Sequence, residues 1–381
     1  MPSTYRPERS QKSLSIDMSW NSEEPYNSLP PLPPAVELET GPILKQCIAS
    51  RAALAALNES ADHLPNRELL VNVMPLLEAQ ASSEIENIVT TTDRLFRSSL
   101  LEGGSSDPAT KEALSYRNAL YEGFRSMEDK PVCTATAERI CSAIKGKEMR
   151  VRQVPGTTLR SDRSGKTIYT PPVGEDLIRH NLANWERFFH DAGSLDPLVA
   201  LAVGHYQFEA IHPFTDGNGR TGRILNLLHL VNSGLLKSPI LYHSGSIIRR
   251  KEDYYRNLTA VTVSGAWENW ILYMLEVIEH SAEWTFRKVA AIRDLRRAVK
   301  RKMKAELPKL YSAELLDVIF HQPYCRIGDV VEADIAKRQA ASTYLKQLVE
   351  TGLLAEEKVG REKLFIHGQF LKLLMEPDNE S

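Results

Sequence analysis

His212-Pro-Phe-Thr-Asp-Gly-Asn-Gly-Arg-Thr-Gly-Arg223 places an imidazole, a carboxylate, a glycine-rich turn and two guanidinium groups within twelve residues. Apolar residues recur at helical spacing on both sides of it, over 198–208 and over 224–231. Asp196-Pro197 suits the cap and first position of the upstream helix, and Gly234 suits the end of the downstream one. The sequence therefore predicts a loop between two core helices, with the glycines and the first arginine at the start of the second.

The start of the second helix has the features of an anion-binding site. The first turn of a helix leaves backbone N–H groups unpaired and carries partial positive charge. Gly217 and Gly219 let the backbone approach an anion closely, because no Cβ stands in the way. Arg220 and Arg223 are three residues apart, so both can project to one side and bind phosphate oxygens. This part of the loop predicts a polyphosphate site.

Asp216 and His212 add two chemical functions to that site. Asp216 offers a hard oxygen ligand of the kind that binds Mg²⁺ beside nucleotide phosphates. The imidazole of His212, with an unperturbed pKa of about 6.5, can accept a proton near neutral pH. Each residue alone has a plainer explanation, as a structural histidine, a turn or a solvated arginine pair. Their combination at fixed spacing favours nucleotide-dependent transfer onto a hydroxyl group, with His212 as general base.

The pattern His-x-Phe-x-Asp-Gly-Asn-Gly-Arg-x-x-Arg resembles, at every fixed position, the signature of Fic-domain (Fido) proteins. These are mostly protein adenylyltransferases, which move AMP from ATP to a Ser, Thr or Tyr hydroxyl. The resemblance implies that His212 is the catalytic base and that Asp216 is the Mg²⁺ ligand. It also implies an ATP-binding set formed by the rest of the loop and the first helical turns: Gly217, Asn218, Gly219, Arg220, Thr221, Gly222 and Arg223.

A second motif, Ser82-Ser-Glu-Ile-Glu86-Asn87, resembles the inhibitory helix of the same family. Ser82 and Glu86 are four residues apart and share one face of a helix. The preceding segment, 69–77, has a helix-compatible apolar pattern in which Pro75 can introduce a kink. In the family the glutamate pairs with the second arginine of the signature, here Arg223, and ATP cannot then bind productively. Because the motif precedes the core, the chain resembles a class II Fic protein.

Residues 156–172 form the exception to a helical core. Thr157–Arg160 and Lys166–Tyr169 flank the turn-prone segment 161–165, which suggests a β-hairpin. In the Fic family a hairpin flap with a similar Tyr-x-Pro-Pro ending lies beside the active site and binds target segments by strand addition. The resemblance makes Ile168 and Tyr169 the flap residues that meet the substrate chain.

The adenine side of the site is less well defined by the sequence. Leu241–Ile248 and Asp253-Tyr254-Tyr255 resemble the region that closes over adenine. Aromatic residues at helical spacing are usually core residues, so the two tyrosines can either pack in the core or contact the nucleotide. Tyr255 is the candidate ATP contact. Ser246 stands where many relatives carry an aromatic residue, which leaves the choice of nucleotide open.

Composition sets compatible limits. The 381 residues suffice for two or three domains, and 42% hydrophobic and 25% charged residues are typical of globular proteins. A net charge of -2 gives no overall attraction to nucleic acid or anionic membranes. The four cysteines lack zinc-site spacing and are expected to be reduced. We find no signal peptide and no apolar stretch approaching the ~20 residues of a membrane span, so we expect a cytoplasmic protein without a membrane partner.

The segment 287–304 is strongly basic, with one acidic residue, Asp294. A solvated linker helix explains it, and a nucleic-acid contact is the alternative. Its nine basic residues are Arg287, Lys288, Arg293, Arg296, Arg297, Lys300, Arg301, Lys302 and Lys304.

The C-terminal region has the pattern of a winged helix. We expect helices over 313–320, 327–332 and 336–351, then strands over 352–359 and 363–366 joined by a wing at Gly360-Arg361. Winged helices bind DNA or serve as protein-interaction modules, and the fold does not decide between them. The third helix presents side chains suited to phosphates and base edges: Lys337, Arg338, Gln339, Ser342, Thr343 and Lys346.

The predicted fold is mainly α: a Fic (Fido) helical core with a β-hairpin flap, an N-terminal helical segment and a C-terminal winged-helix domain. We expect five divisions: an extended segment at 1–35, a helical region carrying the inhibitory motif at 36–110, the core at 111–285, a basic linker helix at 286–307 and the winged helix at 308–381. The Pro-rich part of the first division is expected to be a strap over the domain, and a ligand for proline-binding modules is the alternative.

The predicted function is that of an autoinhibited protein adenylyltransferase using ATP and Mg²⁺. Its partners would be target proteins bearing Ser, Thr or Tyr, and the chain itself through self-AMPylation; the family also allows a homodimer. Two alternatives stay open: another phosphate-group transfer, as in Doc-like kinases, and a DNA-binding regulator with the Fic core as sensor. Doc-like relatives carry Lys where this chain has Gly219, which disfavours the first.

Overall fold

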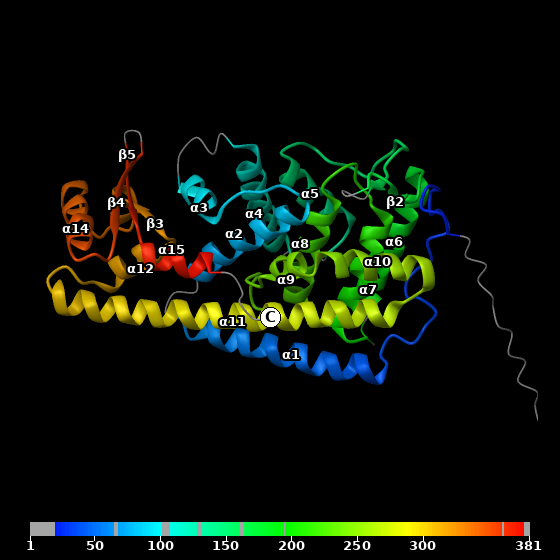
Figure 1. Cartoon of the computed structure of the whole chain (residues 1–381), viewed down its shortest axis with the longest axis horizontal. Coiled ribbons are helices and arrows are strands. Elements are labelled where there is room, and N and C mark those ends of the chain that lie inside the picture. The colour runs from blue at the N-terminus through cyan, green and yellow to red at the C-terminus, as the bar shows by residue number, and fades with distance from the viewer. Residues whose placement is uncertain are drawn as a thin grey trace, which may run out of the picture.

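The structure is a computed structural model that describes residues 20–64, 68–100, 107–127, 132–160, 164–191, 193, 195–359 and 362–376. The predicted polar N-terminus up to residue 19, most of the loop at 103–108, the hairpin tip at 161–163 and the wing tip at Gly360-Arg361 lie outside those residues. The fold is mainly helical with two small antiparallel sheets, as predicted. Figure 1 shows an elongated molecule with the larger helical core at one end and a smaller C-terminal domain at the other.

Two buried helices carry the signature loop between them. Helix α7 (Pro197–Ile211) is buried along nearly its whole length, and helix α8 (Asn218–Asn232) packs against it. The side chain of Asp196 caps α7 by accepting a hydrogen bond from Leu198 N at 2.9 Å. Helices α6 (Glu175–Asp191), α9 (His243–Arg249) and α10 (Lys251–Ser264) complete the surrounding core.

The N-terminal helices cover one side of this core. Helix α1 (Gly41–Asp62) lies along α11 (Trp267–Glu306), whereas α2 (Glu68–Ile85) packs against α9 and α4 (Pro108–Ser126). Helices α3 (Thr92–Leu100) and α5 (Thr134–Lys145) fill the remaining faces. Pro75 lies inside α2 without ending it, because the buried apolar face on both sides of the proline holds the helix against its neighbours.

The predicted hairpin is present as strands β1 (Leu159–Arg160) and β2 (Thr167–Tyr169), which pair antiparallel with Leu159 opposite Tyr169. The proline-rich segment lies across the core beside it. Tyr26 N donates to Thr170 O at 2.9 Å, and Leu32 exchanges hydrogen bonds with the side chain of Asn184 at 2.7 and 3.0 Å. This segment therefore serves as an extended strap over α6 and the flap.

The basic segment 286–307 is not a separate linker helix. It is the second half of helix α11 (Trp267–Glu306), a continuous helix of 40 residues that begins inside the helical core. No glycine or proline interrupts those residues, so nothing in the chain stops the helix at the predicted boundary. Figure 1 shows α11 running the length of the molecule. None of the described helices is long and apolar enough to cross a lipid bilayer.

The C-terminal domain contains the three predicted helices: α12 (Ala313–His321), α13 (Ile327–Glu332) and α14 (Arg338–Glu350). Strands β4 (Ala355–Val359) and β5 (Glu362–Ile366) also form, but they share a three-stranded sheet of order β3-β5-β4. The sequence analysis missed β3 (Tyr324–Arg326) and helix α15 (Gly368–Met375). β3 has three residues and α15 has eight, so both are shorter than the stretch of about 11 residues over which a hydrophobic period is normally recognised.

Specific contacts fix this domain to the N-terminal helices and to α11. The guanidinium of Arg97, on α3, binds both carboxylate oxygens of Glu357 at 2.7 and 2.8 Å, and it lies 5.2 Å from the centre of the Tyr324 ring. Nζ of Lys288, on α11, donates to Leu373 O at 2.7 Å. The two halves of the molecule are therefore joined by charge-assisted bonds as well as by a shared helix.

Candidate active site

The signature loop is closed by its own asparagine. Oδ1 of Asn218 accepts from Phe214 N, and its Nδ2 donates to Phe214 O, both at 2.8 Å. Phe214 is fully buried and anchors the loop to the core. Gly217 has φ 84°, a left-handed conformation that favours glycine, and it turns the chain into the first turn of α8. Asn218 thus shapes the anion-binding turn from within.

His212 directly follows α7 as its C-terminal capping residue, in a left-handed conformation with φ 49°. Its carbonyl oxygen accepts from Nε of Arg152 at 2.8 Å. Burial, and secondly the charge of Arg152, lowers the pKa of the His212 imidazole to about 4. The imidazole is therefore neutral at physiological pH, the state in which it can accept a proton.

Arg223 is held by the segment that contains the second motif. Its Nε donates to Ser82 Oγ at 2.9 Å, and its Nη2 donates to Ser82 O at 2.9 Å and to Glu86 Oε1 at 2.8 Å. The Arg223 side chain is 1% exposed and that of Glu86 is 34% exposed. Although burial disfavours its charge, Glu86 keeps the pKa of Arg223 above the usual value. Arg223 is thus fully engaged by Ser82 and Glu86.

Glu86 lies just past the end of α2 and not within the helix, where the sequence analysis had placed it. The helix ends at Ile85, and Asn87 follows with φ 61°. Ile88 N donates to Ser83 O at 3.0 Å, the bond pattern that closes a helix around a left-handed residue. Asn and Gly adopt that conformation most readily, which explains the residue after the glutamate in this motif.

Two glycines of the loop make room for carboxyl groups. A Cβ at Gly219 would overlap Oε1 of Glu86 and lie 3.0 Å from Nη1 of Arg223. A Cβ at Gly222 would overlap Oε1 of Glu209. Neither glycine has a left-handed conformation, so at both positions the small size of the residue is what the site uses.

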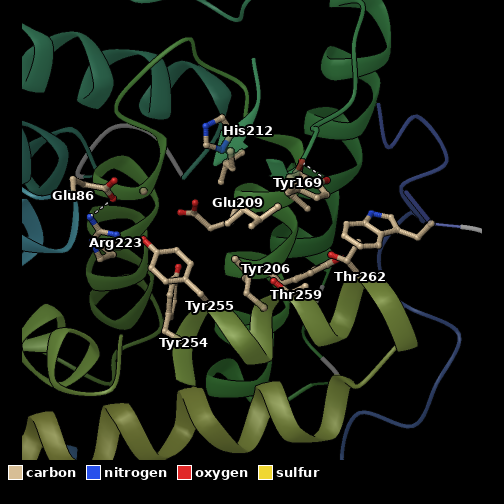
Figure 2. A pocket seen from close by; sticks show the side chains of 16 residues that line it. Glu86, Tyr169, Tyr206, Glu209, His212, Arg223, Tyr254, Tyr255, Thr259 and Thr262 are labelled. Atoms are coloured by element: carbon tan, nitrogen blue, oxygen red, sulfur yellow. Dashed lines mark hydrogen bonds and ion pairs between the residues drawn. The ribbon is translucent and has the colours of Figure 1, made fainter. Parts of the chain in front are cut away.

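The sequence analysis missed Glu209, which lies one turn before His212 on α7. Burial raises the pKa of this carboxyl group to about 8, and its Oε1 has no hydrogen-bond partner among the described residues. Figure 2 shows its carboxyl end pointing toward the side of the pocket where Arg223 and Glu86 lie. The available signal was a lone acidic residue in an otherwise apolar helix.

Asp216 belongs to a cluster of ion pairs that the sequence analysis also missed. Its Oδ2 lies 2.6 Å from Nζ of Lys145, and Lys145 in turn lies 2.9 Å from Oε1 of Glu112. The same oxygen of Glu112 lies 2.5 Å from Nη1 of Arg220. Although burial works in the opposite direction, Lys145 holds the pKa of Asp216 below its usual value. Glu112 and Lys145 carry no motif of their own and become visible only in the folded chain.

Asp216 fits a Mg²⁺ ion whose other ligands are phosphate oxygens and water. Over the described residues, no group of three or more His, Cys, Asp and Glu side chains could enclose a metal ion. Mg²⁺ in nucleotide sites is typically held by one or two carboxylates, with phosphate oxygens and water supplying the rest. A single carboxylate with 58% exposure at the mouth of the anion-binding loop meets that requirement.

The residues predicted to be catalytic and inhibitory meet in one pocket with about 700 Å³ of empty space, its open mouth included. The charged and titratable side chains of its lining are His212, Glu209, Arg223 and Glu86 (Figure 2). The rest of the lining comes from the signature loop, the flap, α7, α10 and the strap: Gly219, Leu159, Ile168, Tyr169, Tyr206, Ala210, Tyr254, Tyr255, Leu258, Thr259, Thr262 and Trp20. Ile168, Tyr169 and Tyr255 therefore line the same pocket as His212 and Gly219 of the loop.

Tyr254 and Ser246 have structural partners. Tyr254 is buried, and its hydroxyl lies 2.8 Å from Nε2 of His205. Ser246 is buried against α11, where its Oγ accepts from Ser281 Oγ at 2.9 Å. Ser246 is not among the residues that line the pocket, so the departure noted in the sequence affects packing behind the site.

Three family models match consecutive parts of the chain. Residues 44–125 match the Fic/DOC family N-terminal model, and residues 110–230 match the Fic/DOC family model. Residues 295–370 match the C-terminal domain of SoFic-like protein adenylyltransferases. The signature loop and the Ser82–Asn87 segment both fall within the matched ranges.

Curated relatives carry the same activity in their names. A protein adenylyltransferase Fic of Nematostella vectensis is 36% identical over 100 residues, which is 26% of this chain and 22% of the relative. A probable protein adenylyltransferase of Aquifex aeolicus is 29% identical over 188 residues, 47% of this chain and 52% of the relative. The chain thus spans about half or less of the length of these relatives.

A crystal structure of a Fic family protein from Desulfovibrio desulfuricans has a similar fold. The TM-score is 0.54 with 18% sequence identity, and the match covers 87% of this chain and 97% of that one. The shared fold therefore extends over the core and beyond it.

Proposed function

Because the chain belongs to the Fic/DOC family, we propose that it is an autoinhibited protein adenylyltransferase, which transfers AMP from ATP to a Ser, Thr or Tyr hydroxyl of a protein and releases pyrophosphate. The observation that carries the proposal is the convergence of His212, the glycine-rich start of α8 and Arg223 on one aromatic-lined pocket. An imidazole next to an anion-binding helix start is the arrangement that phosphoryl chemistry needs.

His212 acts as the general base. Its imidazole is neutral, faces the pocket and lies next to the flap, from which the target hydroxyl would come. It takes the hydroxyl proton as the oxygen attacks the α-phosphorus of ATP. The bond from that phosphorus to the bridging oxygen breaks, and pyrophosphate leaves with the electron pair.

The phosphates are bound by the start of α8. Backbone N–H groups of the Gly217–Gly219 turn, with the positive end of the helix, hold the oxygens that gain charge. Arg220 and Arg223 supply charge-assisted hydrogen bonds. Asp216 would hold a Mg²⁺ ion, which when bound neutralises charge on the α- and β-phosphates. Catalysis is then mainly positioning and electrostatic stabilisation.

Glu86 represses this activity. The Arg223 guanidinium already donates to Ser82 and Glu86, so it cannot also hold the γ-phosphate. The Glu86 carboxylate would in addition repel the incoming phosphates, because it lines the same pocket. Movement of Glu86 away from Arg223 would free the guanidinium for ATP.

Target binding is assigned to the flap. Strand β2 carries Ile168 and Tyr169 along the pocket, and the Tyr169 hydroxyl donates to Ala210 O at 2.8 Å. This bond fixes the flap two residues from His212. An extended target segment that pairs with the flap would bring its hydroxyl to the imidazole.

The two alternatives have weaker support. Gly219 accommodates the Glu86–Arg223 pair, and a lysine there would overlap both side chains, which argues against a kinase-like variant. Residues 308–381 contain nine Lys and Arg against twelve Asp and Glu, so the C-terminal domain has no net charge attraction to DNA.

A direct test uses ATP labelled on the α-phosphate or on the γ-phosphate. The Glu86→Gly variant should transfer the α-label to protein, including itself, and mass spectrometry should locate AMP on a hydroxyl. The Glu86→Gly/His212→Ala variant should lose that transfer while keeping its circular dichroism spectrum. Transfer of the γ-label, or undiminished transfer without His212, would contradict the proposal.

A further inference from the structure

Lys145 is the last residue of α5 and lies at the entrance of the anion-binding loop. Its Nζ is 2.6 Å from Asp216 Oδ2 and 2.9 Å from Glu112 Oε1. Its stem runs past Gly217, where a Cβ would lie 3.5 Å from Lys145 Cδ. The amine is therefore placed at the carboxylate that faces incoming phosphates.

The four charges of this cluster differ in exposure. The side chain of Arg220 is 3% exposed, and those of Lys145 and Glu112 are 18% and 25% exposed. Asp216, at 58%, is the outermost member. Arg220 and Glu112 thus form the fixed inner pair, whereas Asp216 and Lys145 form the outer pair that a ligand meets first.

Asp216 alone would oppose nucleotide binding, because a carboxylate repels phosphate oxygens. Lys145 supplies the compensating charge. Lysine has three donors on a flexible four-carbon stem, so its amine can keep one bond to Glu112 and redirect another. The shared anchor on Glu112 keeps the amine within reach of the loop after the bond to Asp216 is released.

We propose that Lys145 is a further phosphate-binding residue of this site: it neutralises Asp216 while the site is free of nucleotide and donates to a phosphate oxygen once nucleotide binds. The inference rests on the proposed function, since it needs ATP in this pocket. Its consequence is a dependence on metal. Without Mg²⁺, Asp216 is paired with Lys145 at 2.6 Å and more distantly with Nη2 of Arg220 at 3.7 Å, so loss of Lys145 removes the nearer of its two cationic partners. With Mg²⁺ present, the same carboxylate is neutralised by the metal ion as well.

The test measures ATP affinity by calorimetry in the Glu86→Gly variant, with EDTA and then with excess Mg²⁺. Lys145→Gln, which keeps much of the stem, should weaken binding of metal-free ATP about tenfold and binding in Mg²⁺ about threefold or less. Lys145→Arg should restore most of the metal-free affinity. Lys147→Ala, an exposed lysine two residues away, should bind as the parent does in both conditions.

Each result has a distinct meaning. Equal losses with and without Mg²⁺ would mean that Lys145 only supports the loop, and unchanged affinity in Lys145→Gln would mean that it does not bind phosphate; both overturn the inference and leave the proposed function intact. A parent that binds no ATP in either condition would overturn the proposed function and this inference with it. Thermal melting of each variant checks that the fold is retained.

Discussion

Nη2 of Arg223 lies 2.8 Å from Oε1 of Glu86, although 137 residues separate the two in the chain. Arg223 comes from the buried start of α8, and Glu86 comes from the turn that ends α2. The same guanidinium also donates to both Ser82 oxygens, so three hydrogen bonds hold Arg223 in place, and the one to Glu86 is the bond that competes with a phosphate for Nη2.

Glu86→Gly should raise ATP affinity and AMP transfer by roughly 10- to 100-fold, the range expected when one charge-assisted hydrogen bond stops competing for the guanidinium. Glu84→Gly removes an exposed carboxylate from the same helix end and should leave both quantities near the wild-type values. Titration with ATP and a self-modification assay measure the two effects. Equal behaviour of the two variants would argue against repression by Glu86.

Gly219→Ala should destabilise the wild type by about 1–3 kcal/mol, because the new methyl group would overlap the Glu86 carboxylate. The same substitution in a Glu86→Ala background should cost less, since the overlapping group is gone. Thermal unfolding of the four proteins gives the coupling energy of this double-mutant cycle. If the effects of the two substitutions on the free energy of unfolding were strictly additive, residue 219 and Glu86 would not be in steric conflict.

Gly222→Ala should likewise destabilise the fold by about 1–3 kcal/mol, because a methyl group there meets the buried Glu209 carboxyl group. Glu209→Ala in the same chain should recover part of the loss. Gly41→Ala provides the matched control: Gly41 is also helical and has no atoms near the added carbon, so it should be neutral or slightly stabilising. Chemical denaturation measures all three.

The free energy of unfolding should be greatest near pH 6.5. Burial lowers the pKa of His212, His229 and His367 to about 4 and that of His243 to about 3, so below ~6.5 the unfolded chain binds protons that the folded chain does not, and each histidine makes stability fall as the pH falls. Burial raises the pKa of Glu209 to about 8 and that of Glu78 to about 7. The unfolded carboxyl groups lose their protons from ~4.5 upwards, so both glutamates lower stability as the pH rises from ~4.5 to ~8. Below ~6.5 the four histidines outweigh the two glutamates, and above ~6.5 the glutamates act alone.

The alkaline limb gives a sharp test of Glu209. Glu209→Gln keeps the side-chain shape and removes the titration, so it should reduce the stability loss between about pH 6.5 and 8 by about 2 kcal/mol. The rise of stability between about pH 4.5 and 6.5 should become steeper, because residue 209 of the unfolded chain no longer titrates there. Denaturant titrations at several pH values measure both. An unaltered alkaline limb would show that Glu209 does not keep its proton in the folded protein.

Local sequence was informative where the chemistry is contiguous. The loop from His212 to Arg223 is read directly from residue types and spacing, and the flanking apolar periods predict its two helices. The Ser82–Asn87 motif was found only through its family resemblance. Glu112, Lys145 and Glu209 were missed because their roles depend on tertiary neighbours: Glu112 meets Arg220 across 108 residues. The continuity of α11 was not predicted, because the start of the basic segment 287–304 was interpreted as the start of a separate linker helix.

The 40 residues of α11 extend for about 60 Å, and each residue turns the helix by about 100°. A single residue inserted near Arg293 would therefore rotate everything beyond it by more than a quarter turn and carry Glu357 away from Arg97. The orientation of the C-terminal domain is thus a matter of residue count as much as of surface chemistry. Substitutions along the exposed face of α11 leave the rotation of the C-terminal domain about the helix axis unchanged, whereas insertions and deletions within α11 alter it.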